Sequence, residues 1–350
     1  MQRAAILAQA DKRPAAANWM VSPAVDLLLF VGVTLSTIGP WIASDLLRVP
    51  GHYVLIAVAF ANGPHLISTW TRVYLPRKER FRRPVHYWLM PGIAGTFAIA
   101  CNVTDGIGPQ LVRTVIFYWA SWHFAAQSWG ILKIYQRKHG AVGSLEGTLE
   151  KALIFLPAAW CVLHRLYTGP WDLFGVEVLH VVPRAWMVNA FGALVVTLAV
   201  AYVAVWTRRA NLPLIRPVYL CCNAFGFVMP YLVIKNGTSA FAAAALWHAI
   251  QYIAIVWLYN RRRYGGQPDP DARFISYVSQ PGRSLAYVGM IALCAAGVYT
   301  LAFLVTRVVQ ISFETFALTL WTALTLGHYY LDGVIWKFKQ YDLNRELVRP

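Results

Sequence analysis

Hydrophobic residues in this chain fall in long runs, and short polar segments separate one run from the next. A helix needs about 20 mainly apolar residues to cross the hydrocarbon core of a bilayer. Ten runs approach this length: 24–47, 53–75, 86–104, 112–135, 149–168, 185–207, 214–235, 239–260, 284–306 and 314–337. The pattern predicts an all-α fold, a polytopic transmembrane helix bundle of about ten spans.

The runs follow one another without an internal repeat and without a polar tract long enough for a second folded unit. We therefore expect a single integral membrane domain over residues 1–350, with the transmembrane bundle at 24–337. The first residues are too polar for a cleaved signal peptide. We expect residues 1–23 and 338–350 to form cytoplasmic tails.

Loops rich in lysine and arginine alternate with loops poor in them, and this alternation predicts the orientation of the bundle. Cytoplasmic loops of membrane proteins carry an excess of these residues. The basic loops are PRKERFRR (76–83), YQRKHG (135–140), TRRANLPLIR (207–216) and YNRRRYGG (259–266). The loops between them are poor in positive charge. Ten spans with both termini in the cytoplasm fit this alternation, and we expect a multi-pass protein of the bacterial inner membrane.

Composition supports a membrane protein and argues against a nucleic-acid partner. Hydrophobic residues make up 58% of the chain and charged residues only 13%, whereas soluble domains carry about 25% charged residues. The net charge of +16 is distributed over short clusters between apolar runs. A nucleic-acid-binding protein gathers its positive charge on one face, so these clusters are better interpreted as topology signals. We expect membrane lipids, and no nucleic acid, among the partners of the protein.

Four of the nine histidines lie in the interior of expected spans: His65, His123, His248 and His328. Their spans all run in the same direction in the expected topology. Counting to the basic residue that closes each span places the four within roughly 8 Å in depth. Ionisable groups in a bilayer are costly and usually face a functional interior. One metal ion bound by four neutral imidazoles would satisfy all of them, although separate hydrogen-bonded roles in the bundle are the alternative.

Each of these histidines has a polar residue four positions later, and residues at this spacing share a helical face. The companions are Thr69, Gln127, Tyr252 and Asp332. Such residues can fix the tautomer and orientation of a metal-bound imidazole. We expect Asp332 to orient His328, with direct metal ligation as a second role. We expect Gln127 to act as an orienting residue and Tyr252 to donate a hydrogen bond to bound oxygen or substrate.

Ligand type alone does not choose the metal, because imidazole suits iron, copper, zinc and nickel. The histidine boxes of membrane desaturases are absent. A single non-haem iron, Fe(2+), with open positions for dioxygen is the simplest redox site. Copper or zinc would accept the same imidazoles, and haem b would accept two of them.

Three short segments, NGPH (62–65), SWHF (121–124) and LWHA (246–249), resemble histidine-bearing elements of the bacterial Brp/Blh-type β-carotene dioxygenases. The resemblance implies a polytopic protein that binds iron through histidines and splits the central double bond of a carotenoid. Leu66 and Ala125 replace glycines of that pattern, and Tyr252 stands where a second histidine is expected. His328 has no counterpart in the resemblance, and we propose it as the fourth ligand.

These observations favour a membrane-embedded, iron-dependent oxygenase (an oxidoreductase) that acts on an apolar or lipid-like substrate from the bilayer, such as a carotenoid or other isoprenoid. Two alternatives remain open: a b-type haem protein that exchanges electrons with quinone, and a transporter of metal ions or protons through the histidines. Aromatic residues near the histidines could line a substrate pocket or simply pack the bundle. They are Tyr118, Trp119, Trp122, Trp129, Trp247, Tyr252, Tyr329, Tyr330 and Trp336.

Overall fold

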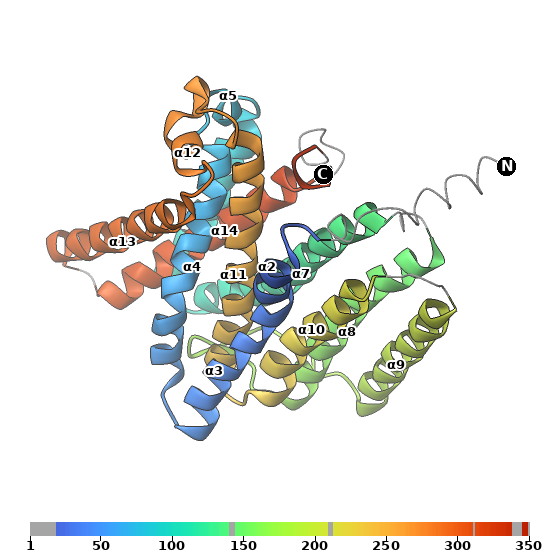
Figure 1. The fold of residues 1–350 in the computed structure, drawn as a ribbon. Coiled ribbons are helices and arrows are strands. Elements are labelled where there is room, and N and C mark those ends of the chain that lie inside the picture. The colour runs from blue at the N-terminus through green and yellow to red at the C-terminus, as the bar shows by residue number, and fades with distance from the viewer. Residues whose placement is uncertain (1–18, 140–143, 209–212, 311, 338–344, 349–350) are drawn as a thin grey trace.

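The structure is a computed structural model, and it describes residues 19–139, 144–208, 213–310, 312–337 and 345–348. Over these ranges the protein is all-α, which confirms the fold class (Figure 1). The strands in this part of the chain form one short ribbon, in which β1 (Asp172–Leu173) pairs antiparallel with β2 (Val176–Glu177). Most of the two expected tails lies outside the described residues.

Every one of the ten apolar runs is helical. The first run is an irregular helix built from α2 (Pro23–Asp26), η2 (Leu27–Val31), η3 (Gly32–Thr37), α3 (Ile38–Trp41) and η4 (Ile42–Leu46). The later runs form η5 (Val85–Leu89) with α6 (Met90–Val103), α10 (Ile215–Val228) with η6 (Met229–Val233), and single helices. These are α4 (Gly51–Val73), α7 (Ile107–His139), α8 (Leu145–Thr168), α9 (Ala185–Thr207), α11 (Gly237–Tyr264), α13 (Ser284–Val309) and α14 (Phe313–Ile335).

Helix α11 is the most enclosed of the long helices. Residues Ala242–Ala245 are at most 4% exposed, and their small side chains let neighbouring helices approach closely. Helix α4 packs along α11, and η3 lies against it on another side. Because α11 is surrounded in this way, polar side chains on it are removed from solvent.

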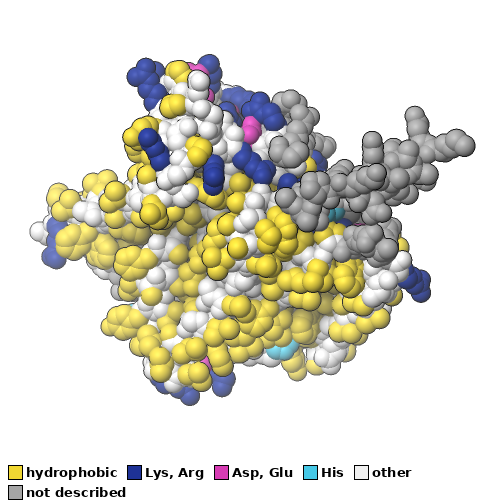
Figure 2. Space-filling model, in the orientation of Figure 1, with side chains coloured by type: hydrophobic (Ala, Val, Ile, Leu, Met, Phe, Trp, Pro, Cys, Tyr) yellow, Lys and Arg dark blue, Asp and Glu magenta, His cyan; other side chains and the backbone are white. Residues whose placement is uncertain are grey.

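The outer helices present large apolar side chains on their exposed faces. Leu285 is 87% exposed on α13, and Phe60 is 82% exposed on α4. Figure 2 shows hydrophobic side chains over the middle of the face that is in view. Within the part of the chain that the structure describes, four helical segments are long and apolar enough to cross a membrane: Pro23–Leu46, Ala185–Thr207, Gly237–Tyr264 and Ser284–Val309. Soluble monomers rarely expose apolar patches of this extent, so these features indicate a membrane protein.

Basic side chains gather at one end of the molecule, over α5 (Arg77–Arg80) and α12 (Arg273–Val278) (Figures 1 and 2). An ion pair between Lys78 and Asp271 joins α5 to η7 (Pro270–Ala272) there. This end therefore consists of polar connections between helices, beyond the apolar middle of the bundle.

Helix α4 continues through Pro64, and the preceding residue, Gly63, allows a neighbouring helix to pack closely. A Cβ added at Gly63 would lie 3.0 Å from the Tyr299 ring and 3.1 Å from the Ala295 Cβ. Both neighbours belong to α13, which packs on α4. The Gly63-Pro64 pair thus lets α13 approach the helix that carries His65.

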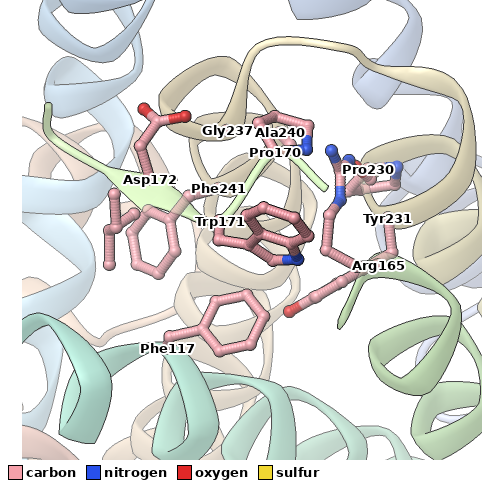
Figure 3. Close-up of a pocket in the computed structure, with 11 residues that line it drawn as sticks. Phe117, Arg165, Pro170, Trp171, Asp172, Pro230, Tyr231, Gly237, Ala240 and Phe241 are labelled. Carbon is pink, nitrogen blue, oxygen red and sulfur yellow. Dashed lines mark hydrogen bonds between the residues drawn. The ribbon is translucent and has the colours of Figure 1, made fainter. Parts of the chain in front are cut away.

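At the opposite end, the ribbon and η6 enclose a small pocket (Figure 3). Arg165 donates hydrogen bonds to the carbonyl oxygens of Pro230 and Ile234, at 2.5 and 2.7 Å. These carbonyls lie at the end of a helix, where backbone acceptors lack helical partners. The pocket holds about 20 Å³, which is space for roughly one water molecule. Arg165 here stabilises the fold.

Candidate metal centre

The structure brings the four interior histidines together in one buried cluster. His65 comes from α4, His123 from α7, His248 from α11 and His328 from α14. In Figure 1, α4 and α11 run toward the upper end of the molecule, whereas α7 and α14 run across the view toward its right side. One ring nitrogen from each histidine lies within 4.8 Å of the others, and no ring is more than 6% exposed. This group can hold a metal ion.

The imidazole rings pack edge to face. Their centroids are 4.3 Å apart for His65 and His328, and 4.8 Å apart for His65 and His248. His123 lies 4.8 Å from His248 and 5.0 Å from His328. Because the planes are steeply inclined to one another, each ring can direct a nitrogen edge toward the shared centre without stacking on its neighbour.

The nitrogens that converge lack hydrogen-bond partners. Nε2 of His65, His123 and His328, and both ring nitrogens of His248, are buried without one. Each such group costs on the order of 1–3 kcal/mol when it leaves water unpaired. Nitrogens on one metal, at about 2.1 Å from it, lie no more than about 4.2 Å apart. The rings therefore need only a small inward shift to bind one ion, and the donor set fits a metal.

Hydrogen bonds fix which nitrogen of His328 faces the centre. Nδ1 of His328 lies 2.7 Å from the Thr69 hydroxyl, which lies 2.7 Å from the Tyr252 hydroxyl. Tyr252 in turn donates to Oδ1 of Asp332 at 2.5 Å. When the Thr69 hydroxyl donates to Tyr252, it accepts a hydrogen bond from Nδ1 of His328, and the lone pair of Nε2 remains available to a metal. The order of groups is His328, Thr69, Tyr252 and Asp332.

His65 is held in a similar way. Its Nδ1 lies 3.3 Å from the Asn62 side-chain oxygen, one helical turn earlier. When Nδ1 donates to this oxygen, Nε2 is left for the metal. The other two histidines are held by ring packing, because the Tyr329 ring lies 4.4 Å from His123 and the Phe124 ring lies 4.5 Å from His248.

The polar residues four positions after the histidines mainly contact side chains of neighbouring helices, and not the histidine of their own helix. Thr69 shares a helix with His65 but contacts His328, and Tyr252 shares a helix with His248 but contacts Thr69 and Asp332. A histidine side chain in a helix leans toward the N-terminal end. The residue one turn later in the chain is therefore free to meet a ring from the neighbouring helix.

Asp332 lies beside the nitrogens that face the centre. Its Oδ2 is 3.6 Å from Nε2 of His328 and 3.7 Å from Nε2 of His123. The connection from Asp332 to Nδ1 of His328 runs through the hydroxyls of Tyr252 and Thr69. The carboxylate can therefore complete the ligand set or balance the charge of a bound cation, in addition to anchoring the hydrogen-bonded chain.

Gln127 differs from its expected role as an orienting residue. Its amide nitrogen donates to the backbone carbonyl of His248 at 3.1 Å and contacts the side chain of Gln251 at 3.4 Å. Its side-chain oxygen has no hydrogen-bond partner, and the residue lines a cavity. Gln127 thus ties α7 to the backbone of α11 and does not bond an imidazole.

Two further residues support this site: Trp336, which the sequence indicated only as a pocket or packing residue, and Arg72, which was not identified from the sequence. Trp336 donates to the Tyr252 hydroxyl at 3.2 Å. The guanidinium of Arg72 lies between the Tyr259 and Trp336 rings, at 4.2 and 4.1 Å, and donates to the Ile335 carbonyl at 2.8 Å. Arg72 follows His65 by seven residues, a spacing that repeats on one helical face, and this spacing could have indicated it.

A cavity of about 450 Å³ adjoins the cluster. His123, Tyr252 and Asp332 form part of its buried wall, so the candidate metal centre opens onto it. Pockets that take small molecules typically range over about 300–1,000 Å³. Of the aromatic residues named from the sequence, six line this cavity: Trp119, Trp122, Tyr252, Tyr329, Tyr330 and Trp336.

Three of the named aromatic residues lie outside the cavity lining, and Tyr118 among them donates to the Leu179 carbonyl at 3.3 Å. Trp247 is 0% exposed and donates to the Gly226 carbonyl at 3.0 Å, so it packs the core. Trp129 lies near Lys133 and Lys151, with ammonium groups 5.5 and 5.9 Å from its ring. The lining residues of α7 share one face of the helix, and Trp129 lies outside that face.

Comparison of this chain with family models, curated proteins and solved structures finds no match in any of the three.

Proposed function

We propose that this protein is a membrane-embedded, metal-dependent oxygenase, with non-haem iron held by His65, His123, His248 and His328. The observation that carries the proposal is the cluster of unpaired, buried imidazole nitrogens beside a cavity of about 450 Å³. Iron bound there would supply activation of dioxygen. The substrate would be an apolar or lipid-like molecule that enters from the bilayer, such as a carotenoid or other isoprenoid.

The residues around the centre would act on both substrate and oxygen. Trp119, Trp122 and Tyr329 provide apolar surface along the cavity and would hold a flat or elongated chain. Tyr252 lines the same cavity and is hydrogen-bonded to Asp332. Its hydroxyl would hold a proton within reach of oxygen or of an oxygenated product.

Oxidative cleavage of a carbon–carbon double bond balances without an outside reductant. The C=C bond and the O–O bond of dioxygen break, and two C=O bonds form. All four electrons that reduce dioxygen come from the substrate. This is the reaction that the Brp/Blh resemblance implies, and a buried site lined by apolar groups suits it because water is kept from the reacting carbons.

We also propose ten spans with both termini in the cytoplasm of a bacterial inner membrane. In this arrangement the end that carries α5 and α12 would be cytoplasmic, since its basic residues follow the positive-inside rule.

The packing of the rings weighs against a haem protein. The centroids of neighbouring histidine rings are 4.3–5.0 Å apart, and the rings contact each other directly. A haem bound by two of them would need a slot for the porphyrin between those two rings.

Metal content tests the proposal. Protein purified in detergent should carry about one iron per chain and show no Soret band. Alanine in place of His65 should abolish iron retention, because the cluster loses one of its four nitrogens. His52→Ala is the matched control, since His52 is exposed on the same helix. A metal-free wild-type protein, or a Soret band, would overturn the proposal.

A further inference from the structure

The polar residues of the cavity are divided between its buried wall and its exposed rim. Among the lining residues that the structure describes, the one carboxyl group is that of Asp332 on the wall, which is 7% exposed. The rim carries two basic side chains, His86 and Lys337, and both residues are exposed. Between them the lining is mainly aromatic and aliphatic. Over the described lining, the basic side chains that face water therefore lie at the opening of the cavity.

This division sets a direction for an amphiphilic ligand. A negatively charged head group at the wall would lose its water, which is unfavourable. No lysine or arginine lines the described wall to replace that water. At the rim the same group would keep contact with water and gain two basic partners. The apolar part of the ligand would then occupy the wall.

The rim histidine is held for such a contact. Nδ1 of His86 lies 2.6 Å from the Tyr330 hydroxyl, and the two rings lie roughly parallel with centroids 6.1 Å apart. When Tyr330 donates to Nδ1, the proton of the neutral imidazole is on Nε2. Nε2 is then a hydrogen-bond donor, and the ring remains a donor when it is protonated.

Building on the proposed function, we propose that the ligand of this cavity is an amphiphile with one long apolar chain and an anionic head group. Lys337 and His86 bind the head, a carboxylate or a phosphate, at the rim. The apolar chain of the ligand extends past Trp122 and Tyr329 toward the histidine cluster.

The position of the rim also determines which part of the ligand's apolar chain lies at the metal centre. From His328 to Ile335, α14 rises about 10 Å, and Lys337 follows two residues later. The ligand atoms beside the histidine cluster thus belong to the middle of its apolar chain, on the order of 10 Å from the head group. A ligand with a very short chain would not reach the centre from this anchor.

Tryptophan fluorescence provides the test, because Trp119, Trp122 and Trp336 line the cavity. The probe is dibromostearic acid, whose bromine atoms quench nearby indoles, added to metal-loaded protein in neutral lipid nanodiscs. Its alcohol and phosphate analogues are compared in parallel. We expect the acid to bind about five- to tenfold more tightly than the alcohol, since two exposed charge-assisted contacts contribute modestly.

Charge-removing variants locate the head group. The double variant Lys337→Gln, His86→Gln should remove the preference for the acid and leave the affinity for the alcohol unchanged. Lys235→Gln is the control, because Lys235 is exposed at a loop outside the cavity lining. A phosphate analogue that binds more tightly than the acid, with the same dependence on Lys337 and His86, would identify the head as a phosphate.

Other outcomes overturn one proposal or the other. If the acid and alcohol bind equally, or if the double variant keeps the preference, the anionic head group is not bound at this rim. The proposed oxygenase would survive that result. If none of the three probes quenches the wild-type protein, the cavity does not accept an apolar chain, and the substrate class of the proposed function fails with it.

Discussion

At the residue scale, the site depends on short hydrogen bonds between side chains from different helices. Thr69 is the clearest case, because its hydroxyl lies 2.7 Å from both His328 Nδ1 and the Tyr252 hydroxyl. It is 0% exposed, so water cannot replace it. A residue of this kind contributes to metal binding without touching the metal.

Replacing Thr69 by valine keeps the shape of the side chain and removes the hydroxyl. Metal affinity should fall about 10–100-fold, the usual effect of losing a partner that orients a ligand. Competition with a chelator of known affinity measures the change. Thr197→Val on α9 is the control, since its exposed hydroxyl bonds only the carbonyl of Ala193 at 2.8 Å. Equal affinities in the two variants would show that Thr69 does not orient His328.

At the element scale, a buried ionic cluster joins four helices away from the metal centre. Arg216 on α10 contacts Glu146 and Glu150 on α8, at 2.8 and 2.7 Å. Tyr202 on α9 and Gln136 on α7 also donate to Glu150, at 2.9 and 2.7 Å. Removing one partner from such a group leaves buried charge uncompensated. The cluster therefore fixes how α8, α9 and α10 pack on α7, the helix that carries His123.

Arg216→Met should destabilise the protein by about 3–5 kcal/mol, because the buried carboxylates lose their guanidinium. The thermal unfolding midpoint of the detergent-solubilised protein would fall accordingly. Arg208→Met, at an exposed position just after α9, should leave the midpoint nearly unchanged. An unfolding midpoint for Arg216→Met equal to that of wild type would mean that the cluster contributes nothing to helix packing.

At the scale of the whole molecule, the apolar middle and the basic end define how the bundle would lie in a membrane. The exposed surface of α9 and α13 is largely hydrophobic, and only 11% and 22% of their apolar windows are buried. Such faces are suited to contact with lipid acyl chains. The histidine cluster, in contrast, lies inside the bundle, where four helices meet.

Thiol labelling in intact cells tests the orientation. In a cysteine-free background, Asp105→Cys should react with a membrane-impermeant maleimide added outside the cell, since its loop is poor in basic residues. Lys78→Cys should react only after the inner membrane is permeabilised. Both positions are exposed, so accessibility within the protein does not limit the reaction. The reverse pattern would invert the proposed topology.

The sequence by itself determined the helical elements and the residues that form the cluster. Apolar runs of span length leave few alternatives to helices in a bilayer. Histidines are also conspicuous where nearly every neighbour is apolar. For these reasons the all-α fold and the group of His65, His123, His248 and His328 follow from the pattern of residues along the chain.

Only the tertiary structure decided which partner each polar residue meets. Helical spacing pairs Thr69 with His65, but the packing of α14 against α4 brings His328 to it instead. The packing of α14 on α7 also placed Asp332 beside Nε2 of His123, and the packing of α7 on α11 turned Gln127 toward a backbone carbonyl. Periodicity in the sequence shows which residues share a face of one helix. Contacts between helices depend on the crossing angles and rotations of the packed helices, and periodicity does not specify these.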